Sequence, residues 1–151
     1  MGMSHTAGRA SNSSVLLTAG NGHGSTNTKV RKFTNAVTVG SALTYTASAT
    51  LGDKVVVNAS GIYAIRYADS CTGAASIFGI SINSAEGTTS VATIVDATCR
   101  GVITAAAASG QNLLWVGTLT AADVVWMHTD GACDSTSVKN SRVLIQLIAP
   151  L

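Results

Sequence analysis

Apolar and polar residues alternate with a period of two along most of the chain, which places every second side chain on the same face of a β-strand. In the segment 60–68, for example, Tyr63, Ile65 and Tyr67 would share one face. Gly, Asn, Asp and Ser, which favour turns, separate such segments about every ten residues. We therefore predict an all-β sandwich or barrel of about eight to ten antiparallel strands. The expected strands are residues 29–39, 42–51, 53–58, 60–68, 75–83, 112–120, 123–130 and 141–150, with one or two more within 90–106.

Several late segments are apolar on both faces of the expected strand. In the segment 112–116, Leu113 and Trp115 would share one face. Leu114 and Val116 would then share the other face, and the last two expected strands show the same pattern. Two packed sheets cover each other on one face only, so the second face needs another copy of the chain or loops of the same chain. We expect an obligate homo-oligomer, and cover by the chain's own loops is the alternative.

The first part of the chain differs from the rest in composition and charge. Residues 1–28 are mostly Gly, Ser, Asn, Thr and Ala, a composition typical of flexible segments. Residues 1–32 carry a charge of +4 with no acidic residue, whereas residues 33–151 carry −2. We predict an extended N-terminal arm over 1–28 and one domain over 29–151, with the arm bound to an acidic protein surface. The basic residues expected to anchor the arm are Arg9, Lys29, Arg31 and Lys32.

The composition of the 151 residues limits the class of protein. Only 11% of the residues are charged and 46% are hydrophobic, which argues against both intrinsic disorder and a long coiled coil. No apolar run is long enough for a transmembrane helix, so we expect no membrane partner. The low charge is unusual for a small domain that is fully exposed to water. It therefore favours a chain whose surface is partly covered by sister subunits and by a partner.

Residues that could carry catalysis are sparse. His5 and His23 fall in the expected arm, where a flexible backbone offers no fixed geometry. His128 and Asp130 would lie on the same face of one strand, but no nucleophile is placed beside them by spacing. We therefore expect no enzyme, no cofactor and no metal site. Nucleic-acid binding is also disfavoured, because the body is acidic and the arm has no aromatic residues for stacking.

The three cysteines, Cys71, Cys99 and Cys133, form no closely spaced pair and cannot all be paired within one chain. We expect reduced thiols, as in a protein made in the cytosol. One intramolecular disulfide is the alternative.

Three segments together resemble a known family. "DKVVVNASGIYAIRYADS" has a strand, a glycine turn and then Gly-x-Tyr with alternating apolar residues. "NLLWVGTLTAADVVWMHTD" has the form of the family's late hairpin, and "SRVLIQLIAP" that of its terminal strand. Over roughly residues 50–150 the chain resembles the C1q/TNF-like jelly roll, which implies a jelly-roll β-sandwich and a homotrimer. The resemblance and the two-faced strands together place six residues in the core or the trimer interface: Tyr63, Tyr67, Trp115, Trp126, Ile145 and Leu147.

The low charge, the content of Ala, Ser, Thr and Gly, and the lack of a signal-peptide pattern narrow this resemblance. In these respects the chain is similar to the trimeric jelly-roll cement, or decoration, proteins of tailed bacteriophages. That similarity implies a structural virion protein on the capsid surface, assembled in the host cytoplasm, whose N-terminal arm holds the major capsid protein. The alternative is a receptor-binding knob of a phage tail fibre or spike that binds a surface glycan.

Overall fold

The computed structural model describes residues 12–25, 30–70, 76–84, 94, 98–105, 110–130 and 138–151. All regular secondary structure in this part of the chain is β-strand. The all-β prediction is therefore confirmed. The ten strands are β1 (Ser14–His23), β2 (Arg31–Val39), β3 (Leu43–Thr46), β4 (Lys54–Val57), β5 (Gly61–Ser70), β6 (Ser76–Ile82), β7 (Cys99–Ala105), β8 (Gly110–Leu119), β9 (Val124–Asp130) and β10 (Val138–Pro150).

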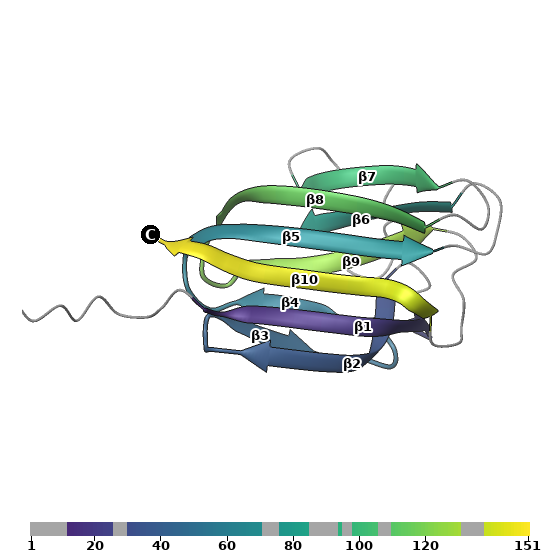
Figure 1. Ribbon diagram of the computed structural model, residues 1–151, viewed down its shortest axis with the longest axis horizontal. Helices are drawn as coiled ribbons and strands as arrows, with labels where there is room; N and C mark the ends of the chain where they lie inside the picture. Colours follow the sequence, from purple (N-terminus) through teal and green to yellow (C-terminus); the bar gives the residue numbers. More distant parts are fainter. Residues whose placement is uncertain are drawn as a thin grey trace, which may run out of the picture.

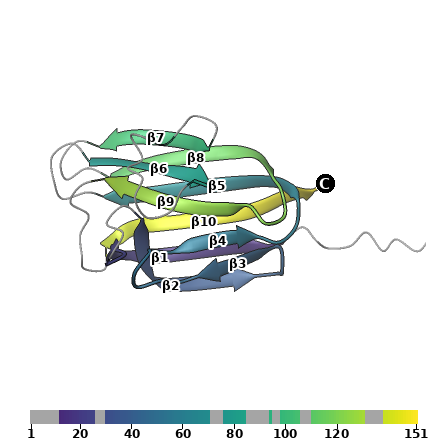
Figure 2. The same cartoon turned by 180° about the vertical axis from the view of Figure 1, so that it is seen from behind.

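The strands form two five-stranded sheets that lie face to face (Figure 1). Sheet I has the order β2-β1-β10-β5-β8, and sheet II has the order β3-β4-β9-β6-β7. Every pair of neighbouring strands is antiparallel. Seen from behind, sheet II lies in front of the long strand β10 (Figure 2). Strands far apart in the sequence are thus neighbours, and the first and last strands pair in the middle of sheet I.

The core fills the space between the two sheets, and the period-two pattern explains which side chains enter it. Tyr63, Ile65 and Tyr67 point inward from β5 and are fully buried. The ring of Tyr67 meets that of Phe78 from β6 edge to face, with centroids 5.2 Å apart. An aromatic pair of this geometry adds about 0.5–1.5 kcal/mol beyond the area it buries. It joins the middle of sheet I to sheet II.

Asp53 connects three segments at one edge of the sandwich. Its carboxylate accepts hydrogen bonds from the Phe33 backbone N–H at 2.8 Å and from the Tyr45 hydroxyl at 2.7 Å. The Ser48 backbone N–H donates to the other oxygen at 3.1 Å. The strand expected over 42–51 therefore ends at Thr46, because the residues after it turn around this buried carboxylate.

The predicted arm over residues 1–28 is wrong for residues 14–23, which form β1 between β2 and β10. Val15 and Leu17 are fully buried, so this segment contributes to the core. Gly20 lies so close to Ser141 and Arg31 that a β-carbon there would collide with both side chains. Glycine in this segment therefore permits close packing, where the composition had suggested flexibility. Residues 1–11 and 26–29, with Arg9 and Lys29, lie outside the described residues.

Candidate assembly interface

Five of the six residues predicted for the core or the trimer interface are buried within the single chain. They are Tyr63, Tyr67, Trp126, Ile145 and Leu147, each at most 1% exposed. The sixth, Trp115, is half-buried at the edge of the core, where the guanidinium of Arg100 lies 5.9 Å from its ring centroid. Contact of these side chains with a neighbouring subunit stays a prediction.

Strand β9 is apolar on both faces, and both faces are covered by the same chain. Val125 and Met127 enter the core between the sheets. Trp126 points to the opposite face of sheet II and is still only 1% exposed. The ammonium of Lys54, its neighbour on β4, lies 5.4 Å from the ring centroid. For β9, the alternative of cover by the chain itself is therefore correct.

The outer face of sheet I is different, because it is apolar and uncovered in the single chain. Of the nine large apolar side chains that are exposed among the described residues, six lie on this face, between 37% and 59% exposed. They are Leu16, Val37, Val39, Leu114, Val116 and Ile148. Large aliphatic side chains that are exposed together on one face often mark an interface.

The strand register places most of these side chains in two neighbouring rows across the sheet, and the row that ends in Val39 and Val116 also contains Ser14 and Gln146. Residues directly opposite each other in an antiparallel pair point to the same face. Leu16 of β1 pairs with Val37 of β2 on one side and with Leu144 of β10 on the other. The same row continues through Arg66 of β5 to Leu114 of β8. One row of outward side chains therefore crosses all five strands, with a single charged residue in it.

Arg31 cannot anchor the chain to a partner, so this part of the arm prediction is wrong. Its side chain is fully buried, and its Nε donates to Asp69 Oδ2 at 2.9 Å. Nη2 donates to Asp69 Oδ1 at 3.2 Å, and Nη1 donates to the Gly22 carbonyl oxygen at 3.2 Å. The Tyr67 hydroxyl also donates to Asp69, at 2.8 Å. Lys32, the next residue, is half-buried on β2.

His23 and His128, the two histidines that the structure describes, are held by the fold, and this corrects the expectation for His23. His23 ends β1 and its Nε2 lies 3.3 Å from Thr129 Oγ1, so its geometry is fixed. His128 is fully buried, with Nε2 2.6 Å from Ser81 Oγ. Ser81 is also fully buried, so this serine–histidine pair has no access to a substrate. No sequence signal could have joined them, because the two residues are 47 positions apart.

Other candidate chemistry is limited in the part of the chain that the structure describes. That part contains no group of three or more His, Cys, Asp and Glu placed to hold a metal ion. That part also contains no helix that could span a membrane. Cys99 is a free, half-buried thiol, whereas Cys71 and Cys133 lie outside the described residues.

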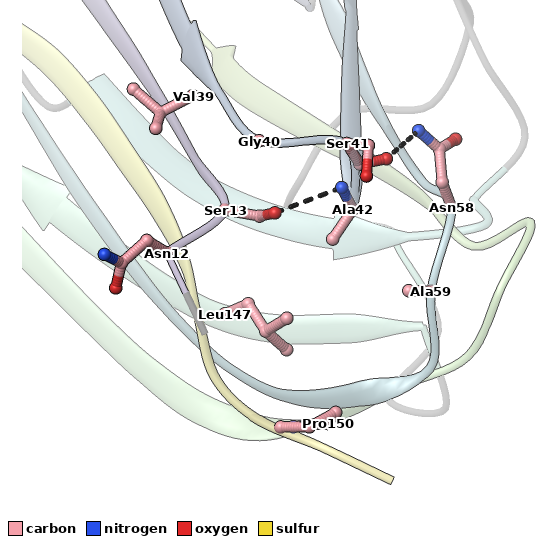
Figure 3. Close-up of a pocket in the computed structure, with 10 residues that line it drawn as sticks. All are labelled: Asn12, Ser13, Val39, Gly40, Ser41, Ala42, Asn58, Ala59, Leu147 and Pro150. Carbon is pink, nitrogen blue, oxygen red and sulfur yellow. Dashed lines mark hydrogen bonds between the residues drawn. The ribbon is translucent and has the colours of Figure 1, made fainter. Parts of the chain in front are cut away.

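A hollow of about 340 Å³ lies at the end of the sandwich where β1 begins and β10 ends (Figure 3). Two of its polar side chains are used by the backbone, because Ser13 Oγ accepts from the Ala42 N–H at 3.2 Å and Asn58 Nδ2 donates to the Ser41 carbonyl at 2.9 Å. No charged residue lines it, so it offers little to orient a polar ligand. Its lining residues are Asn12, Ser13, Val39, Gly40, Ser41, Ala42, Asn58, Ala59, Leu147 and Pro150.

Comparison with known proteins supports the fold. No family model matches the chain, and no curated protein sequence matches it. Murine APRIL, in a crystal structure at pH 8.5, superposes with a TM-score of 0.64 at 14% identity, covering 93% of this chain and 99% of that chain. GITRL from pika superposes with a TM-score of 0.58 at 15% identity, covering 92% and 99%. GITRL from bushbaby superposes with a TM-score of 0.56 at 11% identity, covering 93% of this chain and 96% of that chain.

APRIL and GITRL are TNF-family jelly rolls, so the predicted resemblance to the C1q/TNF-like fold is confirmed. The predicted bacteriophage origin stays a prediction, because none of these matches bears on it. At identities of 11–15% the likeness establishes the fold alone: the chain is a TNF-like jelly roll.

Proposed function

We propose that this protein is a structural component that assembles as a homotrimer through the outer face of sheet I. The observation that carries the proposal is the set of six exposed aliphatic side chains on that face. TNF-like jelly rolls are often trimeric, which favours three copies as the number that assembles. An apolar face that is covered by neighbouring copies also accounts for the low fraction of charged residues, 11%.

We further propose that the trimer is a decoration protein on the capsid of a tailed bacteriophage. The support is the composition together with the segment 1–11 that precedes β1 and carries Arg9. Since Arg31 is buried, Arg9, Lys29 and Lys32 are left to contact the major capsid protein. Three such segments on one trimer would raise the effective concentration of each weak contact. The role is therefore one of binding and stabilising a shell, with no catalysis.

The assembly proposal is tested by placing a charge on the face. Val116 is 56% exposed on β8, so Val116→Lys should leave the fold intact and place a cation in the interface. Val102, 42% exposed on β7 of sheet II, is the matched control. In sedimentation velocity we expect a trimer for the wild type and for Val102→Lys, and a folded monomer for Val116→Lys. A wild-type protein that is a folded monomer at micromolar concentration would overturn the proposal.

The capsid proposal is tested by deleting residues 1–11, which precede β1. A deletion up to residue 28 would remove β1 from the middle of sheet I and unfold the protein, so it is not informative. We expect the shorter deletion to leave a folded trimer that no longer co-sediments with the phage shell. Unchanged binding by the truncated trimer, or a position of the wild-type protein only at the tail tip, would contradict the proposal. The second result would favour the tail-fibre knob.

A further inference from the structure

Two arginines lie on the outer face of sheet I, among its apolar side chains and uncharged polar ones such as Gln146 and Thr118. Arg66 on β5 lies in the row between Leu144 and Leu114, and both neighbours are apolar. Arg142 on β10 lies opposite Ala68, which is two residues beyond Arg66 on β5. Diagonal neighbours of this kind on one face of a sheet lie about 7–8 Å apart. The two exposed guanidinium groups can therefore reach the same point above the sheet.

Neither arginine has an acidic partner in the part of the chain that the structure describes. No residue described on the outer face of sheet I is acidic, as the register shows. The three carboxylates whose side chains are described are engaged elsewhere: Asp53 with Tyr45, Asp69 with Arg31 and Asp123 with Asn83 and the Thr120 N–H. Two like charges thus lie side by side among apolar and uncharged polar side chains.

Covering this face with another copy of the chain makes the two charges costly. Removing water from an unpaired guanidinium is strongly unfavourable. Where copies of this face converge around a threefold axis, each copy adds further arginines and, among the residues that the structure describes on the face, no carboxylate. An oxyanion bound between the two guanidinium groups pairs with both and offsets this desolvation penalty. Each planar guanidinium offers parallel N–H donors that match two oxygens of a phosphate or a carboxylate.

We propose that Arg66 and Arg142 form a binding site for a free oxyanion of the phosphate type, which becomes enclosed when copies assemble through sheet I. The inference rests on the proposed assembly and adds a ligand to it. The bound anion offsets the cost of burying the two positive charges, and the neighbouring copy encloses the anion. Binding of the anion and assembly of the copies therefore promote each other. Assembly is then sensitive to the kind of anion present as well as to ionic strength.

The test measures the protein concentration at which the full-length protein dissociates, in sodium phosphate and in sodium chloride at equal ionic strength. For the wild type we expect dissociation at a roughly tenfold lower concentration in phosphate, since charge-assisted hydrogen bonds readily supply such a factor. Arg66→Gln and Arg142→Gln should show the same dissociation in both salts. Lys54→Gln, which removes one positive charge from sheet II, should keep the wild-type difference. Circular dichroism confirms that each variant is folded.

The experiment distinguishes failure of the proposed assembly from failure of the oxyanion site. A wild type that stays monomeric in both salts overturns the proposed assembly. A wild type that assembles equally well in both salts overturns the oxyanion site and leaves the assembly standing. If Arg66→Gln also weakens that salt-independent assembly, the arginine pairs with a carboxylate of the neighbouring copy, and the free anion is excluded. A phosphate effect that persists in both arginine variants shows adventitious binding and equally overturns the site.

Discussion

The buried ion pair between Arg31 and Asp69 should be among the most sensitive points of the fold. Both side chains are fully buried, and two hydrogen bonds of 2.9 Å and 3.2 Å join them across sheet I. Arg31→Met keeps most of the volume but takes the guanidinium away from the Asp69 carboxylate, which keeps its hydrogen bond from the Tyr67 hydroxyl. Loss of one partner from a buried ion pair costs about 3–5 kcal/mol. That loss is a large part of the stability of a domain, typically about 5–15 kcal/mol.

The assay is urea unfolding followed by circular dichroism, at a fixed protein concentration because the proposed assembly would also contribute to stability. Lys32→Met is the matched control, because Lys32 is the next residue, carries the same charge and is only half-buried. It should change the free energy of unfolding by no more than about 0.5 kcal/mol. Arg31→Met with Asp69→Leu should recover part of the loss, since a buried pair can be replaced by apolar residues at little cost. If Arg31→Met changed the free energy of unfolding no more than Lys32→Met does, Arg31 would be at the surface and the reasoning would be refuted.

Two further changes test other close contacts. Gly20→Ala should lower the free energy of unfolding by about 1–3 kcal/mol, because the new β-carbon collides with Ser141 and Arg31; thermal unfolding that matches the wild type would contradict this packing. Tyr45→Phe should cost about 1–2 kcal/mol through loss of the hydrogen bond to Asp53. Burial, followed by the hydrogen bond and charge of Asp53, raises the pKa of Tyr45 above its usual 10.0. The unfolded chain therefore loses this proton first, so wild-type stability should fall as the pH rises above 10.0, and Tyr45→Phe should lack that part of the decline.

The strands and the core could be predicted because they depend on local order in the sequence. The alternation in 60–68 predicts that Tyr63, Ile65 and Tyr67 share one face, and all three are fully buried. The N-terminal segment could not be assigned in the same way. Its glycine and asparagine residues suit a flexible arm and a closely packed strand equally well, and contact with β10 and β2 decides between them.

Charged and polar residues were the least predictable, because their partners are distant in the sequence. Arg31 belongs to a basic cluster when only its neighbours are considered, and Asp69, its partner, lies 38 residues away on another strand. The contact between Ser81 and His128 joins residues from two strands in the same manner. Electrostatic roles of this kind follow from pairing between strands, which local composition does not contain.

Strands β8 and β9 show that similar sequences can differ in exposure once the strands are placed in the tertiary structure. By sequence alone, "LLWV" and "VVWM" are equivalent: each is apolar on both faces, so each must be covered twice. In the structure β9 lies between β4 and β6 in the middle of sheet II, and Trp126 on its outer face is buried by the same chain. Strand β8 lies at the edge of sheet I, and Leu114 and Val116 on its outer face are more than half exposed. The sequence determined that these strands are apolar on both faces. The sheet to which each strand belongs decided which outer face is exposed, because the outer face of sheet I is open even on its inner strand β10, where Ile148 is 51% exposed.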